Sequence, residues 1–412
     1  MEVSFREATR FWLQLGFTSF GGPAGQIALM HRELVERRRW IDEERFAHAL
    51  SFCVLLPGPE AQQLATYVGW LLHGRLGGVV AGALFVLPSA LLLWALSWLY
   101  VEHGTVPAVA ALFQGLQPAV VALIAVAIPR IARRSLRGSV AAVLALGAFV
   151  ALYLDLLAFP LVVLFGAVVG LLALCPTATS SSPSAPVSLS STARVALACL
   201  ALWWGPILLA GWLQGWDGLL AQQGLFFSEA ACVTFGGAYA VLPYIAEAAV
   251  TRFGWLSSGQ MIDGLGLAET TPGPLIMVVQ FVGFLGGWRG AGTGSALASA
   301  TLSAALVTWV TFLPCFLWVF VGAPYVEGLR GSRRIAGALA GVSAAVVGVI
   351  AQVALWFGTE VLLPGPDRAV DVFAVLLCAA ALAALAWKKV PSAAVVLACA
   401  AAGLIRHSLT ST

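Results

Sequence analysis

The sequence predicts an all-α, polytopic membrane protein made of two inverted-topology repeats, each with two broken or re-entrant helices. The first observation is composition: 60% of the residues are hydrophobic, 10% are charged, and the mean hydropathy is +0.93. Such values belong to membrane proteins and exclude a soluble domain of this length. The second observation is that glycine and proline clusters interrupt the apolar segments. The third is that these clusters recur at a fixed spacing, which indicates a duplication.

Two breaks organise the first half of the chain. Ser19-Phe20-Gly21-Gly22-Pro23 divides residues 5–38, and Pro57-Gly58-Pro59 divides residues 43–73. None of the resulting pieces has the roughly 20 apolar residues that a helix needs to cross a bilayer. We therefore expect each segment to be a re-entrant hairpin or a broken helix.

The same landmarks return 215 positions later. Phe20-Gly21-Gly22 corresponds to Phe235-Gly236-Gly237, Trp40 to Trp255, and Pro57-Gly58-Pro59 to Pro272-Gly273-Pro274. Further on, Leu87-Pro88 corresponds to Leu313-Pro314 at a spacing of 226, so about eleven residues are added near Gly290 in the second copy. Agreement over this length indicates that the duplication covers most of both halves.

The landmarks divide the chain into four parts. Residues 1–174 form the first repeat, 175–193 a linker rich in Ser, Thr and Pro, 194–214 an unpaired connecting helix, and 215–412 the second repeat. Nine apolar runs outside the breaks are candidates for complete spans: 76–101, 106–129, 138–154, 157–174, 194–214, 292–322, 335–357, 370–387 and 391–406. If the broken segments also cross the membrane, the number of crossings rises toward thirteen.

Positive charge predicts how the repeats are oriented. Arg130, Arg133, Arg134 and Arg137 belong to one loop of the first repeat, which we expect on the cytoplasmic side. The equivalent loop of the second repeat, residues 358–371, is mostly acidic, whereas the loops on either side of it are basic. Equivalent loops should therefore lie on opposite sides of the membrane, and the unpaired helix supplies the odd crossing that this inversion requires.

Broken helices in a membrane predict a binding site. Backbone groups freed at a break would each cost several kcal/mol in hydrocarbon, so they must face protein or a water-filled cavity. Pro23 and Pro59 are suited to open half-helices, whose N-termini carry partial positive charge and free N–H donors for an anion. Inverted repeats with such ends near the midplane are a recurrent plan of secondary transporters. The alternative is that the breaks are only kinks that help helices to pack.

The candidate substrate-binding residues lie at the breaks and at two recurring arginines, Arg75 and Arg289, whose paired guanidinium groups suit a tetrahedral oxyanion. The full set is Ser19, Gly21, Gly22, Pro23, Pro57, Gly58, Pro59, Gln62, Arg75, Thr234, Gly236, Gly237, Thr271, Pro272, Gly273, Pro274 and Arg289. Glu269 and Glu60 are candidates for proton coupling, because carboxylates at membrane depth are costly and usually functional. For Glu269 the alternative is pairing with a buried arginine. We expect Asp263, His48, Glu229 and Glu247 to be interfacial.

Other function classes lack support in the sequence. The seven cysteines occur singly, without metal-ligand spacing, so we expect no metal site, no cofactor and no redox enzyme. A net charge of +3 gives no indication of nucleic-acid binding. We find no Walker motif and no catalytic arrangement of Ser, His or paired Asp, so we expect a secondary transporter rather than an enzyme. A cleaved signal peptide is not expected, and a homodimer is one arrangement that the sequence allows.

A family resemblance rests on motifs in both halves. In the first half the motifs are Ser19-Phe20-Gly21-Gly22-Pro23, Trp40-Ile41 before an acidic run and Phe46, Leu56-Pro57-Gly58-Pro59, Gly69 and Leu87-Pro88-Ser89. In the second half they are Thr234-Phe235-Gly236-Gly237, Trp255-Leu256, Ala268-Glu269-Thr270-Thr271-Pro272-Gly273-Pro274 and Phe281-Val282-Gly283. Together they resemble the chromate ion transporter (CHR) family in its long, two-domain form.

The resemblance implies export of chromate, a tetrahedral dianion similar to sulfate, across the bacterial inner (plasma) membrane, with chromate resistance as the outcome. It carries the break motifs over as the candidate binding region. Glu60 departs from the family pattern and adds negative charge beside the expected anion site, so it must be paired, protonated or turned away. Uptake or exchange of sulfate or another oxyanion is the alternative function.

Overall fold

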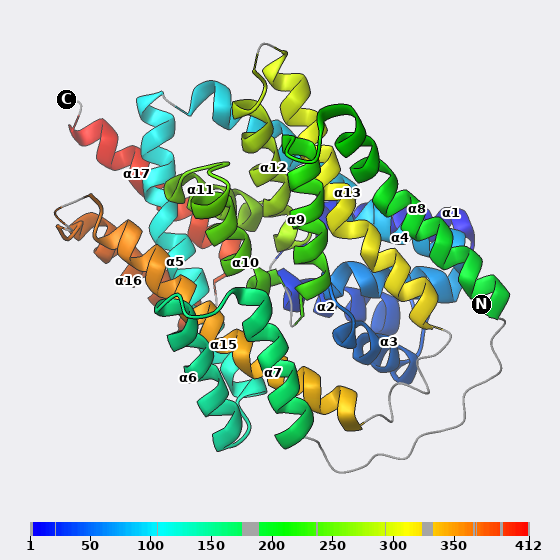
Figure 1. The fold of residues 1–412 in the computed structure, drawn as a ribbon. Helices are drawn as coiled ribbons and strands as arrows, with labels where there is room; N and C mark the ends of the chain where they lie inside the picture. Colours follow the sequence, from blue (N-terminus) through cyan, green and yellow to red (C-terminus); the bar gives the residue numbers. More distant parts are fainter. Residues whose placement is uncertain are drawn as a thin grey trace.

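Helices form all of the regular secondary structure in the part of the chain that the computed structural model describes. Figure 1 shows their arrangement. The described residues are 3–20, 22–104, 106–174, 189–235, 238–292, 294–323, 333–365, 367, 369–387 and 390–410. Six helices are long and apolar enough to cross a membrane, namely those at Glu60–His103, Pro107–Ser135, Thr192–Gln214, Ala296–Gly322, Ala336–Leu362 and Ser392–Thr410. The prediction of an all-α, polytopic membrane protein is confirmed.

The first half begins with two broken segments. It contains α1 (Phe5–Thr18), α2 (Gly22–His31), the π-helix η1 (Arg32–Arg37), α3 (Glu43–Leu55), α4 (Glu60–His103), α5 (Pro107–Ser135), α6 (Ser139–Tyr153) and α7 (Phe159–Ala173). Within α4, His73 and Gly74 leave the helical conformation, with φ of 61° at Gly74. This kink separates the short piece that follows the second break from a long membrane span.

The second half repeats this order of elements. After α8 (Leu189–Gln214) come α9 (Leu219–Val233), α10 (Ala238–Glu247), the π-helix η2 (Ala248–Arg252), α11 (Ser258–Thr270), the 3₁₀ turn η3 (Leu275–Met277), α12 (Val278–Arg289), α13 (Ala296–Gly322), α15 (Arg333–Leu362), α16 (Val372–Ala386) and α17 (Ser392–Thr410). A π-helix closes the first broken segment of each half. A tryptophan follows each π-helix, and its backbone N–H donates a hydrogen bond to the carbonyl oxygen six residues earlier: Trp40 to Leu34 and Trp255 to Ala249.

Several predicted spans are shorter than a bilayer crossing. At a rise of 1.5 Å per residue, α6, α7 and α16, with 15 residues each, extend only about 22 Å, against a hydrocarbon core of about 30 Å. The predicted runs at 138–154, 157–174 and 370–387 are therefore helical but short. The predicted linker at 175–193 lies outside the described residues as far as residue 188, and α8 begins at Leu189.

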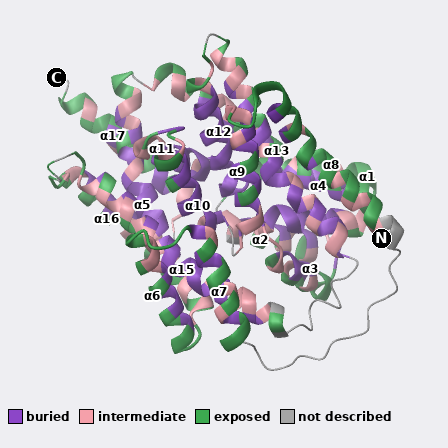
Figure 2. Cartoon of the chain, viewed as in Figure 1, coloured by how far each residue is buried: buried purple, intermediate pink, exposed green. Residues whose placement is uncertain are grey.

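The helices pack around two of the long spans, α15 and α13. On one side α15 packs against α5, α6 and α7, and α5 also contacts α16 and α17; on the other side α13 packs against α4, α8, α9 and α12. Close approach in the first group depends on glycine: a side chain at Gly341 of α15 would lie 2.0 Å from the carbonyl oxygen of Gly166 in α7. Figure 2 shows that the buried residues concentrate around α9, α10, α12 and neighbouring parts of α4 and α13.

Candidate functional site

The breaks of the two halves meet through a reciprocal pair of backbone hydrogen bonds. The N–H of Gly58 donates to the carbonyl oxygen of Thr234 at 2.7 Å, and the N–H of Gly273 donates to that of Ser19 at 2.8 Å. Gly58 corresponds to Gly273 and Ser19 to Thr234 in the internal repeat, so the two bonds are equivalent. Each half therefore completes a break in the other half. We call this meeting point the crossing.

Glycine is required at both donors of the crossing. The backbone φ is 121° at Gly58 and 110° at Gly273, a region that other residues rarely adopt. A side chain at Gly58 would lie 2.7 Å from Sγ of Cys315, and one at Gly273 would lie 2.5 Å from Cβ of Ser89. Cys315 and Ser89 each follow the matched helix proline of the opposite half. The close packing is therefore also equivalent in the two halves.

Four helices begin within a few residues of the crossing. They are α2 from Gly22, α4 from Glu60, α10 from Ala238 and, through the turn at Leu275, α12 from Val278. Pro23 is the second residue of α2, and Pro59 directly precedes α4. Because the N-terminus of a helix carries partial positive charge and free N–H donors, convergence of four such ends makes this region favourable for an anion.

One of the two contacts at the crossing is reinforced by a side chain. The amide nitrogen of Gln26 donates to the carbonyl oxygens of both Ser19 and Gly273, and Gln26 is 1% exposed. The corresponding residue in the second half is Val241, which cannot donate. The two contacts of the crossing are therefore chemically unequal.

A cavity of about 740 Å³ lies beside the crossing. Its walls come from the C-terminal part of α5, the start of α10, the end of α11 and the segment that joins α16 to α17. A neighbouring cavity of about 570 Å³ shares Arg130, Arg134 and Tyr239 with the first and reaches Gly22, Pro23 and Glu60. Together they form a recess that carries several charged side chains and extends to the break residues. We call it the arginine cavity.

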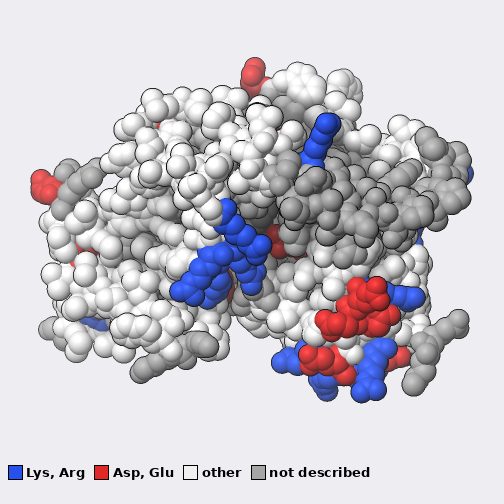
Figure 3. Space-filling model, turned by 90° about the horizontal axis from the view of Figure 1, so that it is seen from below, with Lys and Arg blue, Asp and Glu red and all other residues white. Residues whose placement is uncertain are grey.

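Arginines are the more numerous of the charged side chains that line the arginine cavity. Arg130, Arg133 and Arg134 line the larger part, and Arg137 lines the smaller part. The first three project from the last turns of α5 at spacings of three and four residues, which place them on neighbouring faces of one helix end. Figure 3 looks at this side of the molecule and shows basic side chains gathered beside a recess near its middle.

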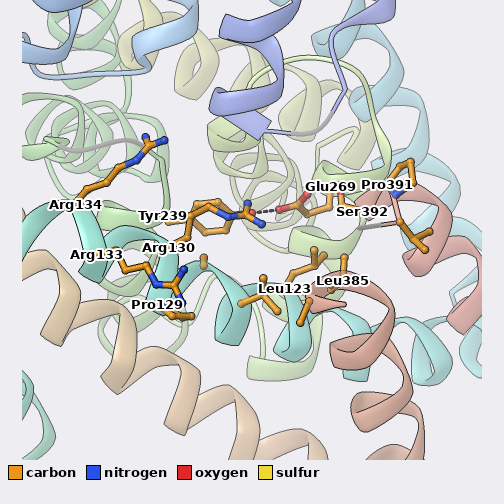
Figure 4. Close-up of a pocket in the computed structure, with 14 residues that line it drawn as sticks. Leu123, Pro129, Arg130, Arg133, Arg134, Tyr239, Glu269, Leu385, Pro391 and Ser392 are labelled. Carbon is orange, nitrogen blue, oxygen red and sulfur yellow. Dashed lines mark hydrogen bonds between the residues drawn. The ribbon is translucent and has the colours of Figure 1, made fainter. Parts of the chain in front are cut away.

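Two carboxylates face these arginines. Glu269, at the end of α11, is 8% exposed and accepts a hydrogen bond from the hydroxyl of Tyr239, as Figure 4 shows. Glu60 is half-buried at the start of α4, and it interacts electrostatically with Arg134. No ion pair of Glu269 is found in the part of the chain that the structure describes. Glu269 and Glu60, the residues proposed for proton coupling, thus face the same cavity.

The structure separates the remaining candidates into two sets. Ser19, Thr234, Thr271, Gln62 and the second-half break are buried around the crossing. Arg75 and Arg289 are exposed and do not line the arginine cavity; Arg289 donates to the backbone of Trp255 and to the side chain of Gln260. Gly21, Gly236 and Gly237 lie outside the described residues.

Two groups of functional interest had other sequence interpretations. The arginines after residue 129 predict the membrane orientation in the sequence analysis and no binding role. Their spacing of three and four residues at the end of an apolar helix is the signal for a shared surface. Asp263 was expected to be interfacial, but it is 6% exposed and hydrogen-bonded to Tyr100 and Gln117. Its position inside an apolar, glycine-rich helix was the available signal.

The fold and the cavity define an all-α, multi-pass membrane protein in which paired helix breaks meet beside a basic recess. Comparisons with known proteins give its family: the model of the family described as "Chromate transporter" matches residues 6–171 and 221–404. The chain belongs to this family.

Named relatives agree with this assignment. A "Chromate transport protein" of Pseudomonas aeruginosa is 37% identical over 360 residues, covering 84% of this chain and 80% of the relative. A protein of the same name from Cupriavidus metallidurans is 30% identical and covers 98% of this chain and 94% of the relative. A "Probable chromate transport protein" of Synechococcus elongatus is 29% identical, with 98% and 95% covered. These relatives are named as transport proteins rather than as enzymes. No solved structure matches the chain.

Proposed function

We propose that the protein is a secondary transporter that exports chromate across the bacterial inner membrane and thereby confers chromate resistance. The observation that carries this proposal is the arginine cavity, which joins a cluster of guanidinium groups to the helix N-termini at the crossing. Guanidinium groups bind tetrahedral oxyanions through charge-assisted hydrogen bonds, and helix N-termini add further donors. The named relatives support chromate as the oxyanion.

The proposal includes two repeats inserted in opposite orientations. The reciprocal hydrogen bonds of the crossing support this arrangement, because each half supplies the equivalent acceptor to the other. Two opposed repeats around a central site allow the protein to expose that site to either face by rocking one unit against the other. The basic end of α5 then lies on the cytoplasmic side, where chromate enters before export.

The driving force follows from charge. A membrane potential that is negative inside favours the exit of a dianion, by about 2.3 kcal/mol per charge for each 100 mV. Uniport is therefore sufficient for export. Proton coupling is an added element of the proposal: Glu269 shares the cavity with Arg130, so binding of an anion there and binding of a proton to the carboxylate affect each other through charge.

The test is flux of radiolabelled chromate in proteoliposomes that contain the full chain, with and without a membrane potential and a pH gradient. We expect potential-driven flux from the arginine-cavity side, and stimulation by a pH gradient if protons are coupled. Absence of chromate flux under every condition would refute the proposal.

Uptake or exchange of sulfate or another oxyanion is the second candidate, since the site chemistry is the same for any tetrahedral dianion. Excess sulfate separates the two functions. Full competition together with sulfate counterflow favours exchange, whereas chromate flux that is insensitive to sulfate favours a chromate exporter.

A further inference from the structure

A second buried carboxylate, Asp263, lies on the same helix as Glu269 but away from the arginine cavity. One oxygen accepts a hydrogen bond from the hydroxyl of Tyr100 at 2.7 Å, and the other accepts one from the amide nitrogen of Gln117 at 2.9 Å. Gln117 precedes Arg130 by thirteen residues in α5, which corresponds to about 20 Å along the helix. The two carboxylates of α11 therefore serve different regions of the molecule.

Aromatic rings pack around the donor Tyr100, and Gln260 and Arg289 lie on its polar side. The ring of Tyr100 packs edge-on against Phe113 at 4.8 Å and Phe281 at 5.2 Å between ring centroids. Asp263 itself is 6% exposed. An ionised carboxylate in such a place is costly unless it is well hydrogen-bonded, and an ionisable group at membrane depth marks a functional site.

No ion pair joins Asp263 to a basic side chain among the described residues. From α12, Arg289 is directed to Trp255 and Gln260. The other titratable or charged side chains near the ends of the helices packed against α11 are Glu102 and His103 of α4, Glu360 of α15, and Arg406 and His407 of α17. Asp263 therefore depends on two neutral donors, which hold it most strongly when it is charged.

The three partners come from three elements. Tyr100 belongs to the last turn of α4, Gln117 to α5 and Asp263 to α11. Asp263 lies in the middle of α11, and the C-terminal end of this helix carries Glu269 in the arginine cavity and leads directly into the break whose Gly273 bonds to Ser19. Any change in how firmly α11 is fixed at Asp263 is thus transmitted along one short helix to the crossing.

We propose that Asp263 is a proton-binding site that controls the position of α11. In its charged form it fixes α11 to α4 and α5 through Tyr100 and Gln117. A proton bound at Asp263 removes the charge that strengthens both hydrogen bonds, and α11 is then free to move with Glu269 and the break. This inference rests on the proposed transport function, and it assigns the proton site to the middle of α11, about 9 Å along the helix from Glu269.

The first experiment compares Asp263→Asn with the wild type in proteoliposomes, using two assays. Chromate–chromate exchange at equal pH should stay within about threefold of wild type but lose its dependence on pH. Net chromate flux driven by a pH gradient should fall at least tenfold. Asp217→Asn, which neutralises an exposed carboxylate, is the matched control and should behave as wild type. An Asp263→Asn protein with the wild-type pH profile and gradient response would overturn the proposal.

Two further measurements cover a failure of that variant to fold. Tyr100→Phe removes one donor and keeps the ring, so the midpoint of the exchange pH profile should move to higher pH, because the charged form has lost a partner. Infrared titration should reveal a protonated carboxyl band whose midpoint moves to higher pH in Tyr100→Phe and stays unchanged in Asp217→Asn. An unmoved transport profile in Tyr100→Phe, or a carboxyl band whose midpoint does not move in Tyr100→Phe, would refute the proton site. If the wild type moves no chromate, the transport proposal fails while the infrared titration still tests Asp263.

Discussion

Arg130 lies where the two cavities beside the crossing overlap, and it faces the buried pair of Tyr239 and Glu269. A guanidinium group in that position can be neutralised either by the protein's own carboxylates or by an incoming anion. An oxyanion that binds there competes with Glu269 and Glu60 for the same positive charge. Binding therefore changes the electrostatic environment of both carboxylates.

Replacing Arg130 with alanine should weaken chromate binding. Loss of one charge-assisted hydrogen bond costs about 1.5–3 kcal/mol, which corresponds to an increase of roughly 10- to 100-fold in KM for chromate. Arg130→Lys should recover only part of the affinity, since an ammonium group lacks the bidentate geometry. Initial rates of chromate flux at varied concentration give the measurement. Arg45→Ala, at an exposed position in α3, is the control, and an equal effect of both substitutions would contradict a binding role.

The two glycine donors of the crossing give a second prediction. Gly58→Ala and Gly273→Ala should each destabilise the protein by about 1–3 kcal/mol through backbone strain alone and should abolish transport, because the new methyl groups also overlap Cys315 and Ser89. Thermal unfolding in detergent and chromate flux are the readouts. Gly147→Ala in α6, where an added methyl group meets nothing within 4 Å, should be neutral. Normal chromate flux in both Gly58→Ala and Gly273→Ala would show that the breaks are only kinks that help helices to pack.

At the scale of residues, the sequence identified the breaks because glycine and proline leave a clear signal inside apolar segments. It did not identify Gln26, whose side-chain amide donates hydrogen bonds to the carbonyl oxygens of both Ser19 and Gly273. Gly273 is 247 positions away from Gln26 in the sequence. A lone glutamine in a helix carries no pattern of its own. Its role follows only from three-dimensional proximity, which one sequence does not contain.

At the scale of elements, the short helices around the crossing act in pairs. One helix of each pair ends and the next begins within a few residues, as for α1 and α2 or α9 and α10. Their stability cannot come from length, because helices of 10 to 15 residues are marginal alone. It comes instead from burial and from bonds such as those of Gln26.

Gln26→Leu should therefore weaken one side of the crossing selectively. The substitution keeps the size of the side chain but leaves the carbonyl oxygen of Gly273 without this donor in a buried site, at a cost of about 1–3 kcal/mol. We expect a lower thermal midpoint and reduced flux. Gln14→Leu, at an exposed position of α1, is the control. Equal thermal midpoints for the two variants would show that Gln26 does not support the crossing.

The order and type of the elements could be predicted from the sequence, because glycine and proline clusters mark the breaks, apolar runs mark the helices, and the fixed spacing of these features marks the repeat. The lengths of α6, α7 and α16 did not, since apolar composition alone continues past the point where each helix ends. The π-helices at Arg32–Arg37 and Ala248–Arg252 were also not predicted. A π-helix differs from an α-helix by one extra residue in a turn, and this difference has no recognisable amino-acid composition. Both π-helices nevertheless lie in the connection between the two breaks of their half.

At the scale of the whole molecule, the two halves depend on each other. Each Pro-Gly-Pro break takes its backbone partner from the opposite half, and each glycine packs against a residue of the opposite long helix. Neither half therefore completes its own break.

Expression of the halves as separate chains tests this dependence. Residues 1–188 or residues 189–412 alone should give no chromate flux, because each lacks the partner of its own break. Co-expression of both should restore flux to within about one order of magnitude, since the contacts between halves are extensive. Gly58→Leu in the first chain should remove the restored activity. Flux from either half alone would contradict an interdependent crossing.

The crossing also constrains how the protein is made. Its hydrogen bonds join segments that leave the ribosome far apart in time, and contacts of such large sequence separation form late. The first half must therefore wait in the membrane with an unpaired N–H at Gly58 until Thr234 has been synthesised and inserted. During that interval the backbone of the nascent chain needs water, lipid headgroups or an insertase as a temporary partner.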